Sequence, residues 1–215
     1  DKALEGGLYE GLYFIGAISS LGKTCFMHQI SDSIARGGRD VLSIALEMSK
    51  SELMARSISR ETFQLAVSKA CPGTAKTTRE ILSRQCRGAS GQGYRPFDDA
   101  DLRMVSQAQN VYSGYGEHIF IIEGVGSIGV TRVREAVEKH IRLTGRVPVV
   151  FVDYLQLLAP GHHARGPEPV FVSVERHPLG FYHYAAGVEV IVISVDFQLL
   201  AHRHLAVGLE AVTIR

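Results

Sequence analysis

The chain of 215 residues is 46% hydrophobic and 21% charged, which suits one α/β domain with a sizeable core and indicates neither a disordered nor a fibrous protein. Its formal net charge of +1 gives no overall attraction to nucleic acid, so any such binding needs a local basic patch. The three cysteines form no C-x-x-C pair, which argues against a disulfide framework or a cysteine zinc site and predicts a reducing compartment. The sequence has neither an apolar run of roughly 18 residues, as a membrane span requires, nor an opening signal peptide. We therefore expect a cytoplasmic protein without a membrane partner.

Residues 13–30 combine an apolar run, a small-residue loop ending in Gly22-Lys23-Thr24, and a segment with helical spacing. A strand at about 12–17, a loop and a helix at 24–35 are the order that a phosphate-binding P-loop needs, because backbone N–H groups and the helix N-terminus then face the phosphates. Lys23 is expected to reach the outer phosphates and the Thr24 hydroxyl a magnesium ion. The predicted phosphate-binding residues are Ser19, Ser20, Leu21, Gly22, Lys23, Thr24 and Cys25. Ala17 replaces the first glycine of the usual pattern, so a chance Gly-Lys-Thr is the alternative.

Gly37-Gly38 is expected to end this helix, and residues 40–46 form a second strand that leads to Glu47. A helix follows, with Ser49 as N-cap and Glu52 completing a capping box. Its predicted buried side carries Leu53, Ala55, Ile58 and Phe63. Glu47 either polarises the water that attacks a γ-phosphate or compensates the helix N-terminus, and the residues alone leave both open.

The next stretch, residues 69–95, is basic. It contains six cations and a single acid, Glu80. We interpret this stretch as a solvated helix and a mobile loop rather than a nucleic-acid contact. The six are Lys69, Lys76, Arg79, Arg84, Arg87 and Arg95. Beyond it we expect helices at 98–111 and 130–143 and strands at 118–123 and 148–153. The alternation of strands and helices predicts a mostly parallel sheet.

The strand at 148–153 is apolar throughout and ends on Asp153. A carboxylate at the carboxyl end of a parallel strand faces the nucleotide crevice, where it can organise magnesium, so Asp153 is a predicted catalytic and metal-binding residue. The alternative is an aspartate that caps the next turn.

A rival pattern, G-x-G-x-x-G, occurs at Gly124, Gly126 and Gly129 between a strand and a helix. It would indicate a Rossmann-type dinucleotide-binding oxidoreductase. We favour it less, because Glu123 would repel a pyrophosphate and Gly-Lys-Thr would have no role. The histidines at 162, 163, 202 and 204 lack nearby cysteines or acids at ligand spacing and are expected at the surface.

Three motifs of the chain belong together: A-I-S-S-L-G-K-T, A-L-E-M-S-K-S-E-L-M-A-R-S-I-S-R and V-V-F-V-D-Y-L-Q-L-L. With them, the chain resembles the RecA-fold ATPase domain of DnaB-type replicative DNA helicases over about residues 8–160. The resemblance implies a RecA-like P-loop NTPase of the α/β class, whose mostly parallel sheet has helices on both faces and its fifth strand between the first and fourth. It also implies ATP and Mg²⁺ as cofactors, a ring homo-hexamer that translocates on single-stranded DNA, and a primase or helicase loader as partner. By position, Lys23 and Thr24 would bind phosphates and magnesium, Glu47 would be the catalytic base, and Asp153 would be the Walker B acid.

The resemblance fails after Pro160. Residues 160–187 form a divergent, loop-rich segment with three prolines, which argue against a long helix there. A fifth strand is expected at 187–194 and a sixth at 205–214. The family's sensor glutamine does not stand at its expected place after the fifth strand; Gln198 is the nearest glutamine, and we do not assign it that role. We therefore interpret residues 1–215 as a single RecA-like ATPase domain and an incomplete motor core. The alternative function is a nucleotide-binding module, like those of circadian-clock and recombinase relatives, that assembles or loads a partner without unwinding.

Overall fold

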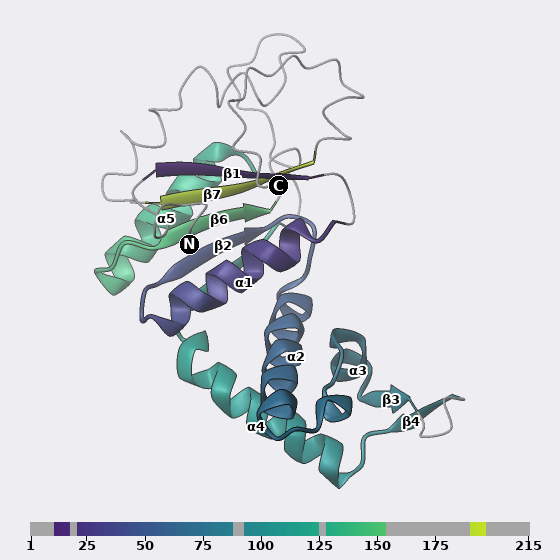
Figure 1. Ribbon diagram of the computed structural model, residues 1–215. Coiled ribbons are helices and arrows are strands. Elements are labelled where there is room, and N and C mark those ends of the chain that lie inside the picture. Colours follow the sequence, from purple (N-terminus) through teal and green to yellow (C-terminus); the bar gives the residue numbers. More distant parts are fainter. Residues whose placement is uncertain (1–10, 18–20, 88–92, 125–127, 154–189, 197–215) are drawn as a thin grey trace.

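The computed structural model describes residues 11–17, 21–87, 93–124, 128–153 and 190–196. These residues contain a five-stranded sheet of order β1-β7-β6-β2-β5, in which every neighbouring pair is parallel (Figure 1). The strands are β1 (Gly11–Ala17), β2 (Val41–Ala45), β5 (Ile119–Glu123), β6 (Val149–Asp153) and β7 (Val190–Asp196). The predicted fifth strand, β7, lies between the first, β1, and the fourth, β6, as the resemblance implied.

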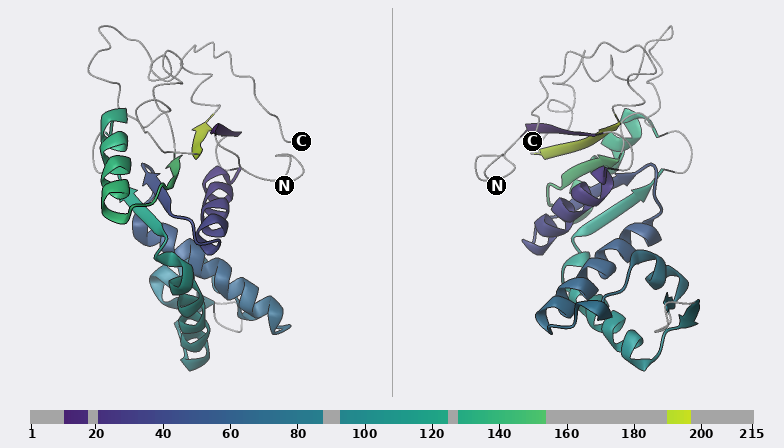
Figure 2. Two further views of the ribbon diagram at one scale, coloured as in Figure 1. Left: turned by 90° about the vertical axis from the view of Figure 1, so that its left-hand side faces the viewer. Right: turned by 45° about the vertical axis from the view of Figure 1, so that its right-hand side comes forward.

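Helices cover both faces of this sheet. Figure 2 shows α1 (Lys23–Arg36) on one face and α5 (Val130–Thr144) on the other. Because both faces are covered, the first four residues of β6 are all buried, as their continuous apolar run predicted. Met27 and Ala35 of α1 pack in the core with Val41 and Phe151 of the central strands. The predicted α/β class, with a parallel sheet between two helical layers, is confirmed.

The helices α2 (Lys50–Ser68) and α4 (Asp99–Gly116) pack together on the β5 side of the sheet, far from β1 (Figure 1). Between them the chain forms η2 (Pro72–Thr74), α3 (Thr78–Ser83) and the antiparallel strands β3 (Gln85–Arg87) and β4 (Tyr94–Pro96). Capping boxes begin α2, α3 and α4, and the predicted box of Ser49 and Glu52 is confirmed. None of the helices within the described ranges has the length and apolar character to cross a bilayer.

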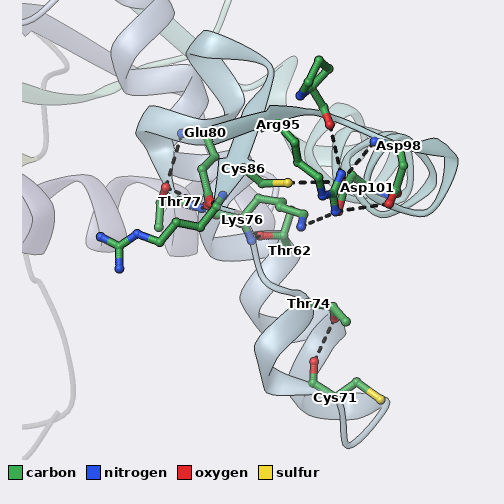
Figure 3. Close-up of polar contacts among 12 residues, drawn as sticks. Thr62, Cys71, Thr74, Lys76, Thr77, Glu80, Cys86, Arg95, Asp98 and Asp101 are labelled. Carbon is green, nitrogen blue, oxygen red and sulfur yellow. Dashed lines mark hydrogen bonds and ion pairs between the residues drawn. The ribbon is translucent and has the colours of Figure 1, made fainter. Parts of the chain in front are cut away.

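Asp101, near the start of α4, binds side chains of the segment between α2 and α4 (Figure 3). Its carboxylate is bound by Lys76 Nζ at 2.5 Å and by Arg95 Nη1 at 2.6 Å, and Cys86 Sγ donates to it at 3.3 Å. Burial by itself would raise the pKa of Asp101, but the hydrogen bonds from Lys76, the Asp98 backbone N–H and Arg95 outweigh it and lower that pKa well below its usual range. Two of the six cations that we expected in a solvated helix and loop are therefore bound to a buried acid instead.

The prediction that Phe63 lies on the buried side of α2 is wrong. Phe63 is 54% exposed, whereas its neighbours Glu61 and Thr62 are buried. Phe63 lies five residues after the buried Ile58, and five residues turn an α-helix through about 500°, or 140° away from the starting face. The predicted strand at 205–214, the segment 160–187 and Gln198 lie outside the described residues.

Candidate nucleotide-binding site

The carboxyl ends of β2 and β6 bring two predicted acids to one edge of the sheet. Ala45 pairs with Asp153 in the parallel register, and the Leu46 backbone N–H donates to Asp153 O at 2.9 Å. Glu47 is the second residue after Ala45, so it follows the end of β2 at the edge where β6 ends on Asp153. Asp153 is partly buried and Glu47 is exposed to solvent. Neighbouring parallel strands that end together in this way form the crevice in which α/β sheets bind ligands.

The turn before α1 belongs to the same edge. Gly22 is the N-cap of α1 and has a φ of +85°, a left-handed conformation that a residue without a β-carbon adopts at little cost. Lys23 Nζ reaches back over the turn and donates to Ala17 O at 3.0 Å. The first turn of α1 holds no acidic residue, so its positive dipole end is free to attract an anion. Leu21 and Cys25 are exposed, and Ser19 and Ser20 lie outside the described residues.

Thr24 and Asp153 come together below this turn. Both line a cavity of about 20 Å³ between α1, β2 and β6, and Glu47 does not. A hydroxyl and a carboxylate supply the hard oxygen ligands that Mg²⁺ prefers, so these two side chains fit the ion that the sequence predicted.

Residues 1–90 match the family model described as DnaB-like helicase C terminal domain. The predicted resemblance to DnaB-type helicases is confirmed. Similar solved structures include one of an ATPase domain, at 22% identity and a TM-score of 0.63 over 91% of this chain and 60% of that one. Another is the structure of a DnaB-like replicative helicase and its interactions with primase, at 23% identity and a TM-score of 0.62 over 86% of this chain and 39% of that one.

At these identities the two structures establish a shared fold, and the chain spans about three-fifths and two-fifths of their lengths. No curated protein matches the chain.

A polar ladder joins α1 to α2 in this domain, and the sequence analysis missed it. His28, Asp32 and Arg36 repeat every four residues along one face of α1. Ser57 Oγ donates to Asp32 Oδ2 at 2.8 Å, and Arg60 Nη2 donates to the same oxygen at 2.5 Å. Further along, Arg36 pairs with the buried Glu61, which also accepts from Tyr115 Oη at 2.8 Å. One signal in the sequence could have revealed this ladder: polar side chains recur every four residues on a helix that must pack against the core.

His28 forms the rung nearest the P-loop. Its Nε2 lies 2.8 Å from Ser57 Oγ and 2.9 Å from Leu53 O. The Ser57 hydroxyl donates its proton to Asp32, so toward His28 it can only accept a hydrogen bond. His28 Nε2 therefore carries a proton and donates to both Ser57 Oγ and Leu53 O. Burial lowers the pKa of His28 and outweighs the attraction of Asp32, so the ring is neutral at pH 7. The ladder therefore fixes α2, which follows Glu47, against α1, which carries Lys23 and Thr24.

The rival glycine pattern has another explanation in this fold. A β-carbon on Gly124 would lie 2.6 Å from Leu46 Cδ2 and 3.3 Å from Leu46 Cα, so the close packing between the ends of β5 and β2 favours a glycine there. Gly129 is the N-cap of α5, and Gly126 lies outside the described residues. The Glu123 carboxylate is directed to the first N–H of α2, at Lys50.

Proposed function

We propose that the chain is the ATP-binding and ATP-hydrolysing motor domain of a DnaB-like replicative helicase, which couples hydrolysis to translocation on single-stranded DNA. The observation that carries the proposal is that Thr24 and Asp153 line one cavity at the carboxyl edge of the sheet, in a chain whose residues 1–90 match the DnaB-like model. Lys23 precedes Thr24, and Glu47 follows β2, the strand whose Ala45 pairs with Asp153. The proposed partners are single-stranded DNA, further copies of the chain in a hexamer, and a primase or helicase loader.

In the proposed mechanism, the backbone of residues 19–25 surrounds the phosphates of ATP. Lys23 exchanges its hydrogen bond to Ala17 O for a phosphate oxygen and neutralises the charge that grows in the transition state. Thr24 and Asp153 hold Mg²⁺, which when bound withdraws charge from the phosphate oxygens. Glu47, exposed at the mouth of the site, accepts a proton from the attacking water and orients it.

The basic span contributes fewer cations to a DNA surface than its composition indicates. Lys76 and Arg95 bind Asp101, and Lys69 Nζ donates to Gln107 Oε1 at 2.6 Å. The exposed cations left in the span are Arg79, Arg84 and Arg87. A contact of this span with the phosphates of single-stranded DNA would therefore use these three arginines.

Steady-state ATP hydrolysis, measured with Mg²⁺ and with or without single-stranded DNA, tests the proposal. Lys23→Ala is expected to lose ATP binding, whereas Glu47→Gln should bind ATP and hydrolyse it about 10²- to 10⁴-fold more slowly. Asp153→Asn is expected to need more Mg²⁺. Glu117→Gln is the matched control, since its side chain is 75% exposed at the opposite edge of the sheet.

The outcomes separate the candidate functions. Hydrolysis that rises with DNA and depends on all three residues supports the motor. ATP binding without turnover or response to DNA would favour a RecA-like assembly module, and undiminished binding by Lys23→Ala would overturn the P-loop.

A further inference from the structure

His28 joins the start of α1 to the start of α2. It lies one turn after Thr24, and its Nε2 is 2.9 Å from Leu53 O and 2.8 Å from Ser57 Oγ. Leu53 is in the first turn of α2, and Glu47 lies shortly before that helix begins. The ring therefore links the helix that follows the P-loop to the helix that follows Glu47, near the end of each that faces the candidate site.

The contacts of His28 close a loop between the two helices. Ser57 Oγ, which accepts from His28, donates in turn to Asp32 Oδ2 at 2.8 Å, and Asp32 lies one turn after His28 on α1. The His28 side chain is 10% exposed and that of Asp32 is 0% exposed, so water does not readily replace a bond that breaks here. A slide or rotation of α2 against α1 would break at least one of these bonds.

Other contacts between the helices are farther from the site or more exposed. Arg36, which pairs with Glu61, is eight residues after His28, or about 12 Å farther along the helix. Arg56 Nη1 donates to Cys25 Sγ at 2.7 Å, but this contact is exposed and a thiol is a weak acceptor. His28 is thus a largely buried connection at the P-loop end of α1, whereas Arg36 holds the far end of that helix.

We propose that His28 is a positioning residue, which holds the first turns of α2, and thereby Glu47, in a fixed position relative to the P-loop. This inference rests on the proposed function and extends it. The P-loop would set the position of the γ-phosphate, whereas Glu47 belongs to a separate segment. The attacking water is therefore aligned with the phosphate only when the two segments keep one relative position, and a displacement of about 1 Å can lower the rate about 10²-fold.

Two variants of His28 separate positioning from folding. His28→Leu removes the donor and leaves no acceptor without a partner. The Ser57 hydroxyl still donates to Asp32, and Leu53 O still accepts from the backbone N–H of Ser57 within α2. The variant should therefore fold. His28→Gln places an amide N–H near the position of Nε2 and should restore the link.

Steady-state ATP hydrolysis by the full chain gives the first test. His28→Leu should lower kcat about 10- to 100-fold and leave the KM for ATP unchanged, and His28→Gln should recover most of the loss. Gln29→Leu is the matched control, because it places the same side chain at the next, exposed position of α1. Arg36→Lys weakens the pair with Glu61, so it should lower the melting temperature without changing kcat. A kcat that fell in step with the melting temperature across these variants would refute the inference.

A double-mutant cycle tests whether His28 acts through Glu47. Single-turnover hydrolysis compares the effect of His28→Leu in the wild-type chain and in Glu47→Gln. The loss should be about 10- to 100-fold in the wild type and small once the Glu47 carboxylate is replaced, because no base remains to be positioned.

The outcomes distinguish this inference from the proposed function. An unchanged rate in His28→Leu, equal losses in the two backgrounds, or a His28→Gln variant as slow as His28→Leu would overturn the inference and leave the proposed function intact. Hydrolysis by Glu47→Gln at the wild-type rate would instead show that Glu47 is not the base, and the role of His28 would fall with it.

Discussion

The Glu123 carboxylate accepts a hydrogen bond from the backbone N–H of Lys50, with 2.5 Å between Oε1 and the nitrogen. Glu123 ends β5 and Lys50 begins α2, so the side chain joins two elements at the carboxyl edge of the sheet. A negative charge at this end of a helix is favourable, because the first N–H groups have no partner within the helix. Glu47 lies three residues before Lys50, and the contact therefore holds one end of the segment that carries it.

We predict that Glu123→Ala lowers kcat for ATP hydrolysis about 10- to 100-fold, since a displacement of about 1 Å in a reacting group has effects of this size. The KM for ATP should change little, because the P-loop lies on β1, three strands away from β2. Steady-state kinetics of the variant, with Glu117→Ala as an exposed control, measure both constants. An unchanged kcat would show that Glu123 does not position Glu47.

The network around Asp101 gives a prediction about stability. Asp101→Asn leaves the Lys76 ammonium, which is 9% exposed, without its charged partner. Loss of one member of a buried pair typically costs about 3–5 kcal/mol of unfolding free energy. Urea denaturation at pH 7 should give a loss of that order, while Asp99→Asn, at an exposed position of the same helix turn, should resemble the wild type.

The pH dependence of this loss follows from the lowered pKa of Asp101. A carboxyl group whose pKa falls on folding contributes stability that is complete above the unfolded value of 3.8 and declines as the pH falls further. The difference between wild type and Asp101→Asn should therefore be constant from pH 7 to about pH 5 and shrink toward pH 3. A difference that grew at low pH would contradict the assignment.

Local signals in the sequence were sufficient to predict much of the fold, and they also indicated the candidate site. The apolar run into Gly22-Lys23-Thr24, the capping box of Ser49 and the buried strand ending on Asp153 each lie within a few consecutive residues. Such patterns determine strand, turn and helix through backbone hydrogen bonds and burial of one face, so they can be interpreted without knowledge of the fold. The strand order needed the family resemblance, because periodicity does not reveal which strands are neighbours.

What the sequence could not predict depends on side chains that are distant in the chain. His28 meets Ser57 across 29 residues, and Lys76 meets Asp101 across 25. Each of these residues alone is indistinguishable from an ordinary surface residue, since partners that satisfy a buried charge appear only when helices pack. The roles of Lys23, Glu47 and Asp153 stay predictions, which the hydrolysis measurements are designed to test.

Ser57 is the centre of the ladder between α1 and α2, because it both accepts from His28 and donates to Asp32. We predict that Ser57→Ala lowers the unfolding free energy by about 1–3 kcal/mol, the usual cost of leaving a buried polar group without its partner. Urea denaturation at pH 7 measures this, and Ser33→Ala, which loses only an exposed hydroxyl, is the control. A cost below that of the control would show that Arg60 alone satisfies Asp32.

The neutral ring of His28 predicts how stability changes near neutral pH. A histidine whose pKa falls on folding contributes stability that is complete above its unfolded pKa of about 6.5 and is lost as the pH falls toward the folded value. Between those two values the unfolding free energy should fall by at most about 1.4 kcal/mol per pH unit from this residue.

The variant His28→Gln keeps a donor near the position of Nε2 and cannot be protonated in this range. Its unfolding free energy, measured by urea denaturation from pH 8 to pH 5, should decline less steeply than that of the wild type. His118→Gln serves as the control for loss of a histidine elsewhere, since His118 pairs with Asp40 at the opposite edge of the sheet. Parallel curves for His28→Gln and the wild type would mean that His28 is protonated as readily in the folded chain as in the unfolded one, and the neutral tautomer assigned to the ladder would be wrong.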